Sequence, residues 1–545
     1  MSKVRPDYDA QLERMAFFQS HRILIIVLAV SAGLGTGLLL VLIWLNFRMG
    51  PTVKARVEKV VADRFDSDVK LDRLDIQLLP APHIEGYGLT VHHKHRTDVP
   101  PLITIQRFTA DADFATMIGA ANHLVRNVRL EGLVIQVPPG FKKANSADSA
   151  AQAPKHPIQP ASDNHFPFEI GELIADGTIL KILPRQEGRE PMEFLIHKLR
   201  MNSVGLNQPM AFVATLTDAK PPGFIESKGA FGPWQKDDLG ATPVSGDYTF
   251  AHADLAAFTG ISGILSSVGR YEGTLNHIVV DGTTDTPDFE VNTGAYKVRL
   301  TTKFHAIVDG TTGDTALEPV KAKFLQTDLI CRGTVAGQPG VKGKTVSLHV
   351  ETKAGRIEDL TRLCVKTDKP VMTGPTRFNT EFVLPPGQQD VMSKLILNGQ
   401  FIVAAARFTD PNIQSKLEAL SRRSRGEVTE AQKAADDKSI TSDLGAHFAL
   451  HAGTLTLTDF QFSVPGAHIL LNGTYGLHAE DIDLHGKAKL DAHLSQMTTG
   501  FKSKLLKLAD PFFAKDGAGT VLPIKITGTR TSPSFGVDFH KMEFP

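Results

Sequence analysis

Apolar and polar residues alternate along most of the chain, which is the pattern of strands that bury one face. The alternation is clearest near the C-terminus, where Gly, Pro or Asn separates the alternating segments. The apolar positions there are Leu455, Leu457, Phe460, Phe462, Ile469, Leu471, Ile482 and Leu484. Because side chains two residues apart point to the same face of a strand, we predict that these eight share one apolar face of an antiparallel sheet.

Two octapeptides share the skeleton Gly-Thr-x-x-Thr/Ser-Pro-x-Phe. They are "GTTDTPDF", which begins at Gly282, and "GTRTSPSF", which begins at Gly528. Each glycine can adopt the positive φ that ends a strand, and Pro287 and Pro533 each remove a hydrogen-bond donor from the ladder. We therefore predict a hairpin turn at both octapeptides and a repeated β architecture.

Only a few segments have helical spacing. Residues 51–65 place their apolar residues on one face with Lys and Arg opposite, as in a short amphipathic helix. Asp410 and Pro411 are the residue types of an N-cap and a first helical residue, and 500–513 has helical spacing again. The predicted fold class is therefore mainly β with a few short helices.

Residues 23–47 contain no charged residue. At ~1.5 Å per residue they are long enough to cross a hydrocarbon layer ~30 Å thick. A cleavable signal peptide is the alternative, but its apolar core is shorter and leads to small residues, whereas this segment ends beside Trp44. We predict an uncleaved single-pass transmembrane helix. Gly33 and Gly37 either let two such helices approach closely, or have no packing role in a transmembrane helix that stands alone.

Composition narrows the function classes. Lys+Arg and Asp+Glu are balanced at 59 each, so the positive excess typical of a nucleic-acid-binding protein is missing. Cys331 and Cys364 are the only cysteines, too few for a structural zinc site. They either form one disulfide in an oxidising compartment or stay as unpaired core thiols.

Three segments resemble catalytic or metal-binding motifs and fail on inspection. The Gly-Lys-Thr at Gly343 ends like a phosphate-binding loop, but the first glycine is misplaced and a strand pattern follows, which favours a hairpin. His92, His93 and His95 have no acidic partner nearby, which favours a solvated loop. Ser262 lacks the second glycine of a nucleophile elbow. We predict a protein that is not an enzyme and has no cofactor or metal.

Composition and pattern divide the chain into seven segments. They are an N-terminal segment (1–22), the transmembrane helix (23–47), a helix with the first strands (48–141), a disordered linker or loop rich in Ala, Ser and Pro (142–164), central strands (165–408), a helical insert with a charged loop (409–442) and a C-terminal β region with one helix (443–545).

Four features together resemble the AsmA family of envelope proteins. They are the N-terminal anchor, the amphipathic helix followed by "LLPAPHIEGYGLTV", the segment "VRLEGLVIQVP" whose pattern recurs at "FEIGELIADGTILKILP", and the C-terminal "GTVLPIKITGTRTSPSFGVDF". The matching positions are fold markers: Pro80, Pro82, Gly86, Gly528 and Pro533. The chain departs from the family at Asp66-Ser67, where members usually have a glycine between the first helix and the first strand.

The resemblance implies a location and a function. It implies an inner-membrane anchor with the N-terminus in the cytoplasm, the bulk of the chain in the periplasm, and an elongated, curved antiparallel sheet that forms an apolar groove. Phospholipid acyl chains would lie on the eight apolar side chains, with other envelope proteins as partners. The alternative is a structural or assembly factor for outer-membrane biogenesis that carries no lipid. The periodicity itself does not distinguish an open groove from a sheet folded on itself into a closed core.

Overall fold

The chain is mainly β, with 70% of its described residues in strands and few helices. A computed structural model describes residues 54–55, 58–59, 62, 67–77, 83–93, 100–112, 123–137, 168–183, 192–204, 208–219, 221–233, 235, 238–291, 296–338, 341–364, 369–387, 389–427, 440–497, 519–530 and 532–538. The chain divides into two compact units. Unit 1 comprises 1–136, 158–178 and 202–205, and unit 2 comprises 137–157, 179–201 and 206–545.

Unit 1 holds the first strands of the chain. Their bounds are β1 (Ser67–Lys70), β2 (Arg73–Gln77), β3 (His83–His93), β4 (Ile103–Ala112), β5 (His123–Glu131), β6 (Val134–Val137) and β7 (Phe168–Ala175). β3 pairs antiparallel with β1, β2 and β4, and β4 pairs antiparallel with β5 and β6. β5 and β7 pair in parallel, contrary to the expectation of a purely antiparallel sheet. Parallel neighbours need a connection of a dozen or more residues, and the chain between Glu131 and Phe168 supplies it.

The helix predicted over 51–65 is partly described. Lys54, Ala55, Glu58, Lys59 and Ala62 are helical. This helix is tied to the turn between β1 and β2, because Lys54 Nζ donates to the Asp72 carbonyl (3.1 Å) and the Leu71 amide donates to Glu58 Oε1 (3.0 Å). Leu71, in the turn, is only 1% exposed.

Unit 2 holds most of the strands. Their bounds are β8 (Thr178–Ile182), β9 (Met192–Val204), β10 (Met210–Ala219), β11 (Pro222–Phe231), β12 (Pro243–Asp254), β13 (Ile261–Ser262), β14 (Ile264–Thr274), β15 (His277–Val291), β16 (Val298–Val308), β17 (Thr315–Phe324), β18 (Thr327–Gly337), β19 (Lys344–Arg356), β20 (Met372–Thr373), β21 (Pro375–Leu384), β22 (Ile396–Phe408), β23 (Ser442–His451), β24 (Thr454–Val464), β25 (Ala467–Gly476), β26 (Asp481–Leu490), β27 (Thr520–Thr529) and β28 (Ser532–Val537). β6, β8 and β9 each cross a unit boundary.

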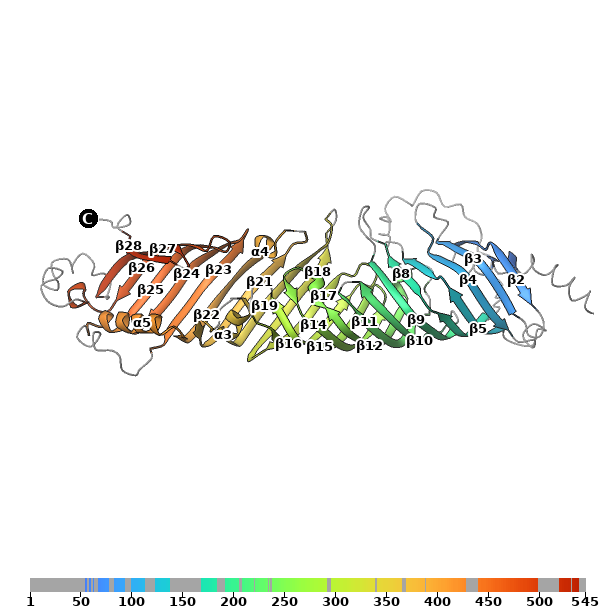
Figure 1. The fold of residues 1–545 in the computed structure, drawn as a ribbon, viewed down its shortest axis with the longest axis horizontal. Helices are drawn as coiled ribbons and strands as arrows, with labels where there is room; N and C mark the ends of the chain where they lie inside the picture. The colour runs from blue at the N-terminus through green and yellow to red at the C-terminus, as the bar shows by residue number, and fades with distance from the viewer. Residues whose placement is uncertain are drawn as a thin grey trace, which may run out of the picture. The chain divides into compact units, whose positions relative to one another are not determined.

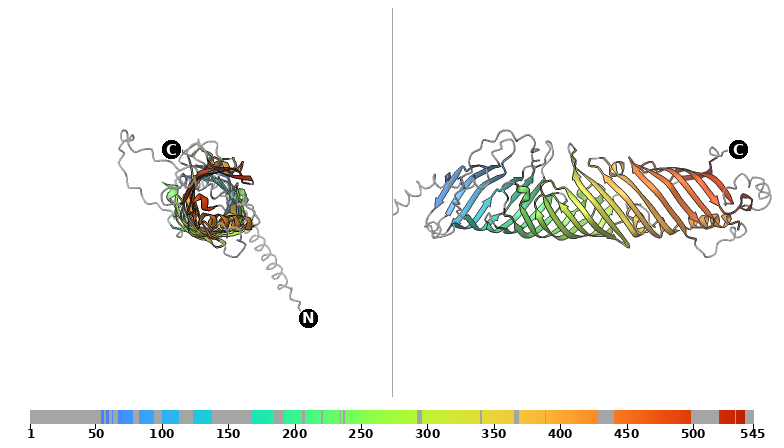
Figure 2. Two further views of the ribbon diagram at one scale, coloured as in Figure 1. Left: turned by 90° about the vertical axis from the view of Figure 1, so that its left-hand side faces the viewer. Right: turned by 180° about the vertical axis from the view of Figure 1, so that it is seen from behind.

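The strands of unit 2 form an unbroken antiparallel series in chain order. From β10 to β28 each strand pairs with the next one, except for the two-residue strands β13 and β20 (Figure 1). β13 pairs with β15, and β20 pairs with β22. Neighbouring strands lie about 4.8 Å apart, so this series extends on the order of 80 Å across its strands. Register shifts interrupt several ladders, for example between Val403 and Ala406 and between Leu457 and Phe460. Such bulges increase local twist and curvature, and unit 2 is strongly curved in Figure 2.

The short helices of unit 2 lie at strand ends. Their bounds are α3 (Ile357–Cys364), α4 (Val391–Lys394) and α5 (Pro411–Ser424), with 3-10 turns η1 (Leu239–Ala241), η2 (Leu255–Ala257) and η3 (Leu494–Met497). Asp410 caps α5 as predicted, because its Oδ1 accepts from the Asn412 amide (2.7 Å) and the Ile413 amide (3.3 Å), and Pro411 is the first helical residue.

The two octapeptides have different structures. At Gly528 the prediction is confirmed: the residue has a φ of +103°, and it ends the β27–β28 hairpin, where it faces Pro533 across the ladder. At Gly282 the predicted turn is wrong, since β15 runs continuously from His277 to Val291. Pro287 lies where the β15–β16 register shifts between Thr286 and Phe289, so its missing donor costs the ladder little.

Several predicted features lie outside the described residues. They are the transmembrane helix at 23–47, the linker at 142–164, the helix at 500–513, and Pro80 and Pro82. Among the described residues no helix has both the length and the apolar character needed to cross a membrane.

Cys331 has no disulfide partner. It is a free, half-buried thiol on β18, and burial raises its pKa. Of the two alternatives for the cysteines, the structure has the unpaired thiol.

Candidate functional site: an apolar sheet face

All eight apolar residues singled out in the sequence lie on one face of β24, β25 and β26. Phe460 faces Leu471 and Phe462 faces Ile469 across the β24–β25 ladder. Leu457 and Leu484 both face Gly473, from β24 and β26. Leu455 and Ile482 likewise face Tyr475 from either side. The bulge at Asp459, which has a φ of +50°, keeps the two halves of β24 on the same face. We call this side of the unit 2 sheet the apolar face.

Most of these side chains are only half-buried. Leu471 is 1% exposed, whereas the other seven are half-buried and retain contact with solvent. Towards the C-terminal edge of the series the face is more open still, because Phe535 on β28 faces Ile526 of β27 and is 73% exposed. A sheet that had folded onto a second layer would bury such residues.

The apolar face continues beyond β24–β26 as a row of directly opposed side chains, here called the apolar row. Its members, from β19 to β26, are Leu348, Phe382, Leu397, Leu450, Leu455, Tyr475 and Ile482. At about 4.8 Å per strand the row extends roughly 30 Å. Leu450 is buried at 4% exposure, and the other six are half-buried.

Two of the described helices pack on the apolar face near the strand ends. Leu420 of α5 packs against a cluster of Val464, Ala467, Ala488 and Leu490. Ile357, the first residue of α3, packs against a second cluster of Val403, Ala406 and Leu444. In the end-on view α5 lies on the inside of the curved strands (Figure 2, left). The apolar face is therefore the concave side near α5, and neither of these two clusters contains a member of the apolar row.

Glycines let aromatic rings lie against the sheet. A Cβ at Gly282 would stand 2.7 Å from Phe304 Cζ and 2.9 Å from the Tyr248 hydroxyl. A Cβ at Gly246 would stand 2.8 Å from the Tyr271 hydroxyl. The aromatic rings thus occupy the space that a side chain at each glycine would take, and they lie close to the backbone of the sheet. Gly282 serves this packing and not the turn that its sequence context suggested.

The face also carries hydroxyl groups, which sequence patterning missed because it treats Ser, Thr and Tyr as outward-facing polar residues. Six of them on β11, β12, β14, β15 and β16 form what we call the hydroxyl patch: Ser227, Tyr248, Ser267, Tyr271, Thr284 and Thr302. Three hydrogen bonds join them in pairs: Ser227 with Tyr271 (2.7 Å), Tyr248 with Ser267 (3.1 Å) and Thr284 with Thr302 (2.7 Å). Burial raises the pKa of both tyrosines, so their hydroxyls stay protonated.

The opposite face of the sheet carries cross-strand ion pairs. Arg299 binds Asp285 through two hydrogen bonds (2.9 and 2.7 Å), which lower the pKa of that carboxyl group. His305 lies directly opposite Asp281, with 2.9 Å between Nδ1 and Oδ1. These groups are solvent-exposed, so each pair contributes little to stability, and together they make this side of the sheet a hydrated surface.

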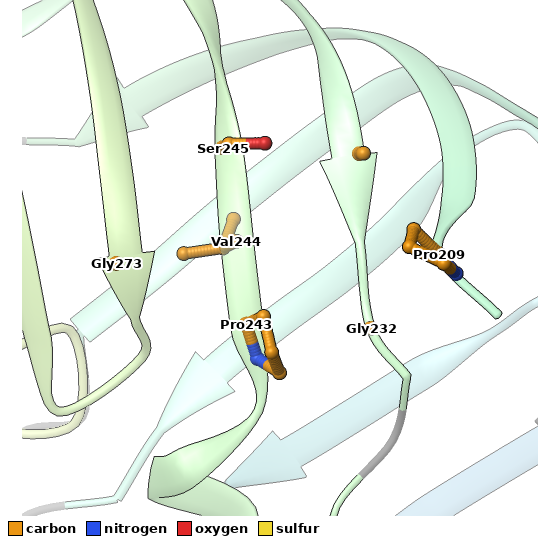
Figure 3. A pocket seen from close by; sticks show the side chains of 7 residues that line it. Pro209, Gly232, Pro243, Val244, Ser245 and Gly273 are labelled. Carbon is orange, nitrogen blue, oxygen red and sulfur yellow. The ribbon is translucent and has the colours of Figure 1, made fainter. Parts of the chain in front are cut away.

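A cavity of about 230 Å³ lies at the ends of β11, β12 and β14. Pro209, Ala230, Gly232, Pro243, Val244, Ser245 and Gly273 line it (Figure 3). The lining offers one side-chain hydroxyl, that of Ser245, and no charged side chain.

The segments that resembled catalytic or metal sites lie in strands and turns of the sheet wherever the structure describes them. Gly343 has a φ of +98° and lies in the loop between β18 and β19, so the predicted hairpin is confirmed. The predicted solvated loop is wrong at His92 and His93, which end strand β3 and pair with β1. His95 lies outside the described residues. No group of three or more His, Cys, Asp or Glu side chains suited to a metal ion occurs in the described part of the chain. Ser262 lies on the two-residue strand β13.

Comparison with protein families, with curated proteins and with solved structures found no match to this chain. The resemblance to the AsmA family therefore rests on the sequence features given above.

Proposed function

We propose that this protein is a non-enzymatic envelope protein that carries phospholipids between the inner and outer membranes along the apolar face of unit 2. The observation that carries the proposal is the half-buried apolar row, which has large side chains on a curved sheet and stays clear of the helix-packed clusters. A row of large apolar side chains that keeps part of its surface in contact with water is typical of a binding surface.

The length of the apolar row suits a lipid chain. Roughly 30 Å matches the hydrocarbon thickness of a whole bilayer, so the row accommodates an extended acyl chain with room to move along it. Moving hydrocarbon through water costs about 0.8 kcal/mol per CH₂ group, and a continuous apolar surface avoids that cost at each step. Polar headgroups would remain at the hydrated opening.

The predicted anchor at 23–47 would attach the protein to the inner membrane, with the described residues in the periplasm. This part of the proposal depends on the uncharged segment and on the family resemblance. Its test is protease protection in spheroplasts, in which an external protease should digest the residues that follow the anchor.

The lipid proposal is tested by purifying the full-length protein and analysing extracted lipid by mass spectrometry. Leu457→Lys, on the apolar face, should lose most of the bound phospholipid. Thr456→Lys, the neighbouring residue on the opposite face of β24, should retain it. A folded wild-type protein without phospholipid would contradict the proposal and favour a structural or assembly role.

A further inference from the structure

The hydroxyl patch introduces hydrogen-bonding groups into a face that is otherwise apolar. Ser267, Thr284 and Thr302 oppose one another on β14, β15 and β16. This row is flanked by apolar neighbours, because Phe250 lies opposite Ser267 and Ala322 lies opposite Thr302. A ligand on these strands therefore meets hydroxyl groups and hydrocarbon side by side.

The protons of the patch can be accounted for pair by pair. Ser227 donates to the Asp247 carbonyl (3.1 Å), so it accepts from Tyr271, and both protons of that pair are used. In the pair of Tyr248 and Ser267 one hydroxyl donates to the other, and the second proton has no acceptor among the described residues. The same holds for Thr284 and Thr302. Each of these two pairs thus has one hydroxyl proton without a protein acceptor.

The two hydroxyl protons without a protein acceptor remain accessible to a ligand. Tyr248, Thr284 and Thr302 are half-buried, and only Ser267, at 6% exposure, is buried. Neighbouring strands place opposed side chains about 5 Å apart, so the two donors lie close together. They match a ligand with two adjacent acceptors that carry no proton of their own and are attached to hydrocarbon.

We propose that the hydroxyl patch binds the paired ester carbonyls of a diacyl lipid. This inference rests on the proposed lipid-carrying function and deepens it. The ester carbonyls join the acyl chains to the polar headgroup, so they are the acceptors that would pass over β14–β16 while the chains lie on the apolar residues beside them. The patch would therefore act as a resting position that selects ester-linked lipids.

The test compares an ester lipid with its ether analogue, which has the same chains and headgroup but no carbonyls. Delipidated full-length protein is titrated with dioleoyl phosphatidylethanolamine and with the matching dioleyl diether, each in detergent micelles. Wild-type protein should bind the ester roughly tenfold more tightly, as expected for two net hydrogen bonds. The double variant Thr284→Val/Thr302→Val should lose most of this preference.

The control variant is Thr283→Val/Thr301→Val, which makes the same changes one residue away, on the opposite face of the same strands. It should keep the ester preference. Equal binding of both lipids by wild-type protein would overturn the proposal that the hydroxyl patch binds ester carbonyls, but it would leave the proposed lipid-carrying function in place. Binding of neither lipid would overturn the proposed function and this inference together.

Discussion

The assignment of faces predicts opposite outcomes for two adjacent leucines of β25. Leu471 lies on the apolar face and is 1% exposed, whereas Leu470 points to the opposite face and is 41% exposed. Leu471→Ala removes a buried side chain and leaves a cavity beside Phe460, which typically costs 2–5 kcal/mol; we expect about 3 kcal/mol here. Leu470→Ala should change the free energy of unfolding by about 0.5 kcal/mol.

The assay is urea denaturation of the delipidated protein, followed by far-ultraviolet circular dichroism. From the midpoint and slope of each curve, the free energies of unfolding of the two variants should differ by about 2.5 kcal/mol. The two substitutions are chemically identical, so composition and strand propensity cancel in the comparison. Equal losses, or a larger loss for Leu470→Ala, would refute the assignment of faces throughout this part of the sheet.

Three further predictions concern packing, charge and capping. Gly282→Ala would press a methyl group against Phe304 and should lower the free energy of unfolding by about 1–3 kcal/mol in urea denaturation. The control is Gly445→Ala, where the nearest atom to the added methyl group is 3.3 Å away, and it should be nearly neutral. Equal effects of the two substitutions would contradict the ring packing. His485 donates hydrogen bonds to the carboxylates of Asp538 and Asp483, which raise its pKa. The contribution of His485 to stability is therefore present in full below about pH 6.5 and is lost as the pH rises through the folded-state pKa. His485→Gln should therefore flatten the fall of Tm above pH 6.5, and an unchanged slope would contradict this. Asp410→Ala should cost about 1 kcal/mol by uncapping α5, and Asp410→Asn should not; a neutral Asp410→Ala would show that the cap contributes nothing.

Strand alternation predicted the features that depend on local sequence. A period of two places Leu455 with Leu457, and Phe460 with Phe462, on one face of the strand. The bulge at Asp459, which lies between the two pairs, then keeps both on the same face. Asp410 and Pro411 identified the start of α5 because capping depends on only a few adjacent residues. The hairpin at Gly528 follows in the same way, since its φ of +103° is a local requirement for glycine.

Features set by distant contacts could not be predicted. Gly282 looks like a turn residue in its octapeptide, but Phe304 and Tyr248 from other strands determine its role. The hydroxyl patch depends on the register of five strands, which periodicity does not specify. α3 is only eight residues long, too short for helical spacing to stand out from strand alternation.

The central claim is that hydrocarbon from lipid, and not a second protein layer, covers the apolar face. Site-specific photocrosslinking in cells tests it most directly, with a benzophenone side chain placed at Leu457 or at its neighbour Thr456, which lie on opposite faces of β24. We expect phospholipid adducts at position 457 and none at position 456. No lipid adduct at 457, or equal adducts at both positions, would contradict the claim.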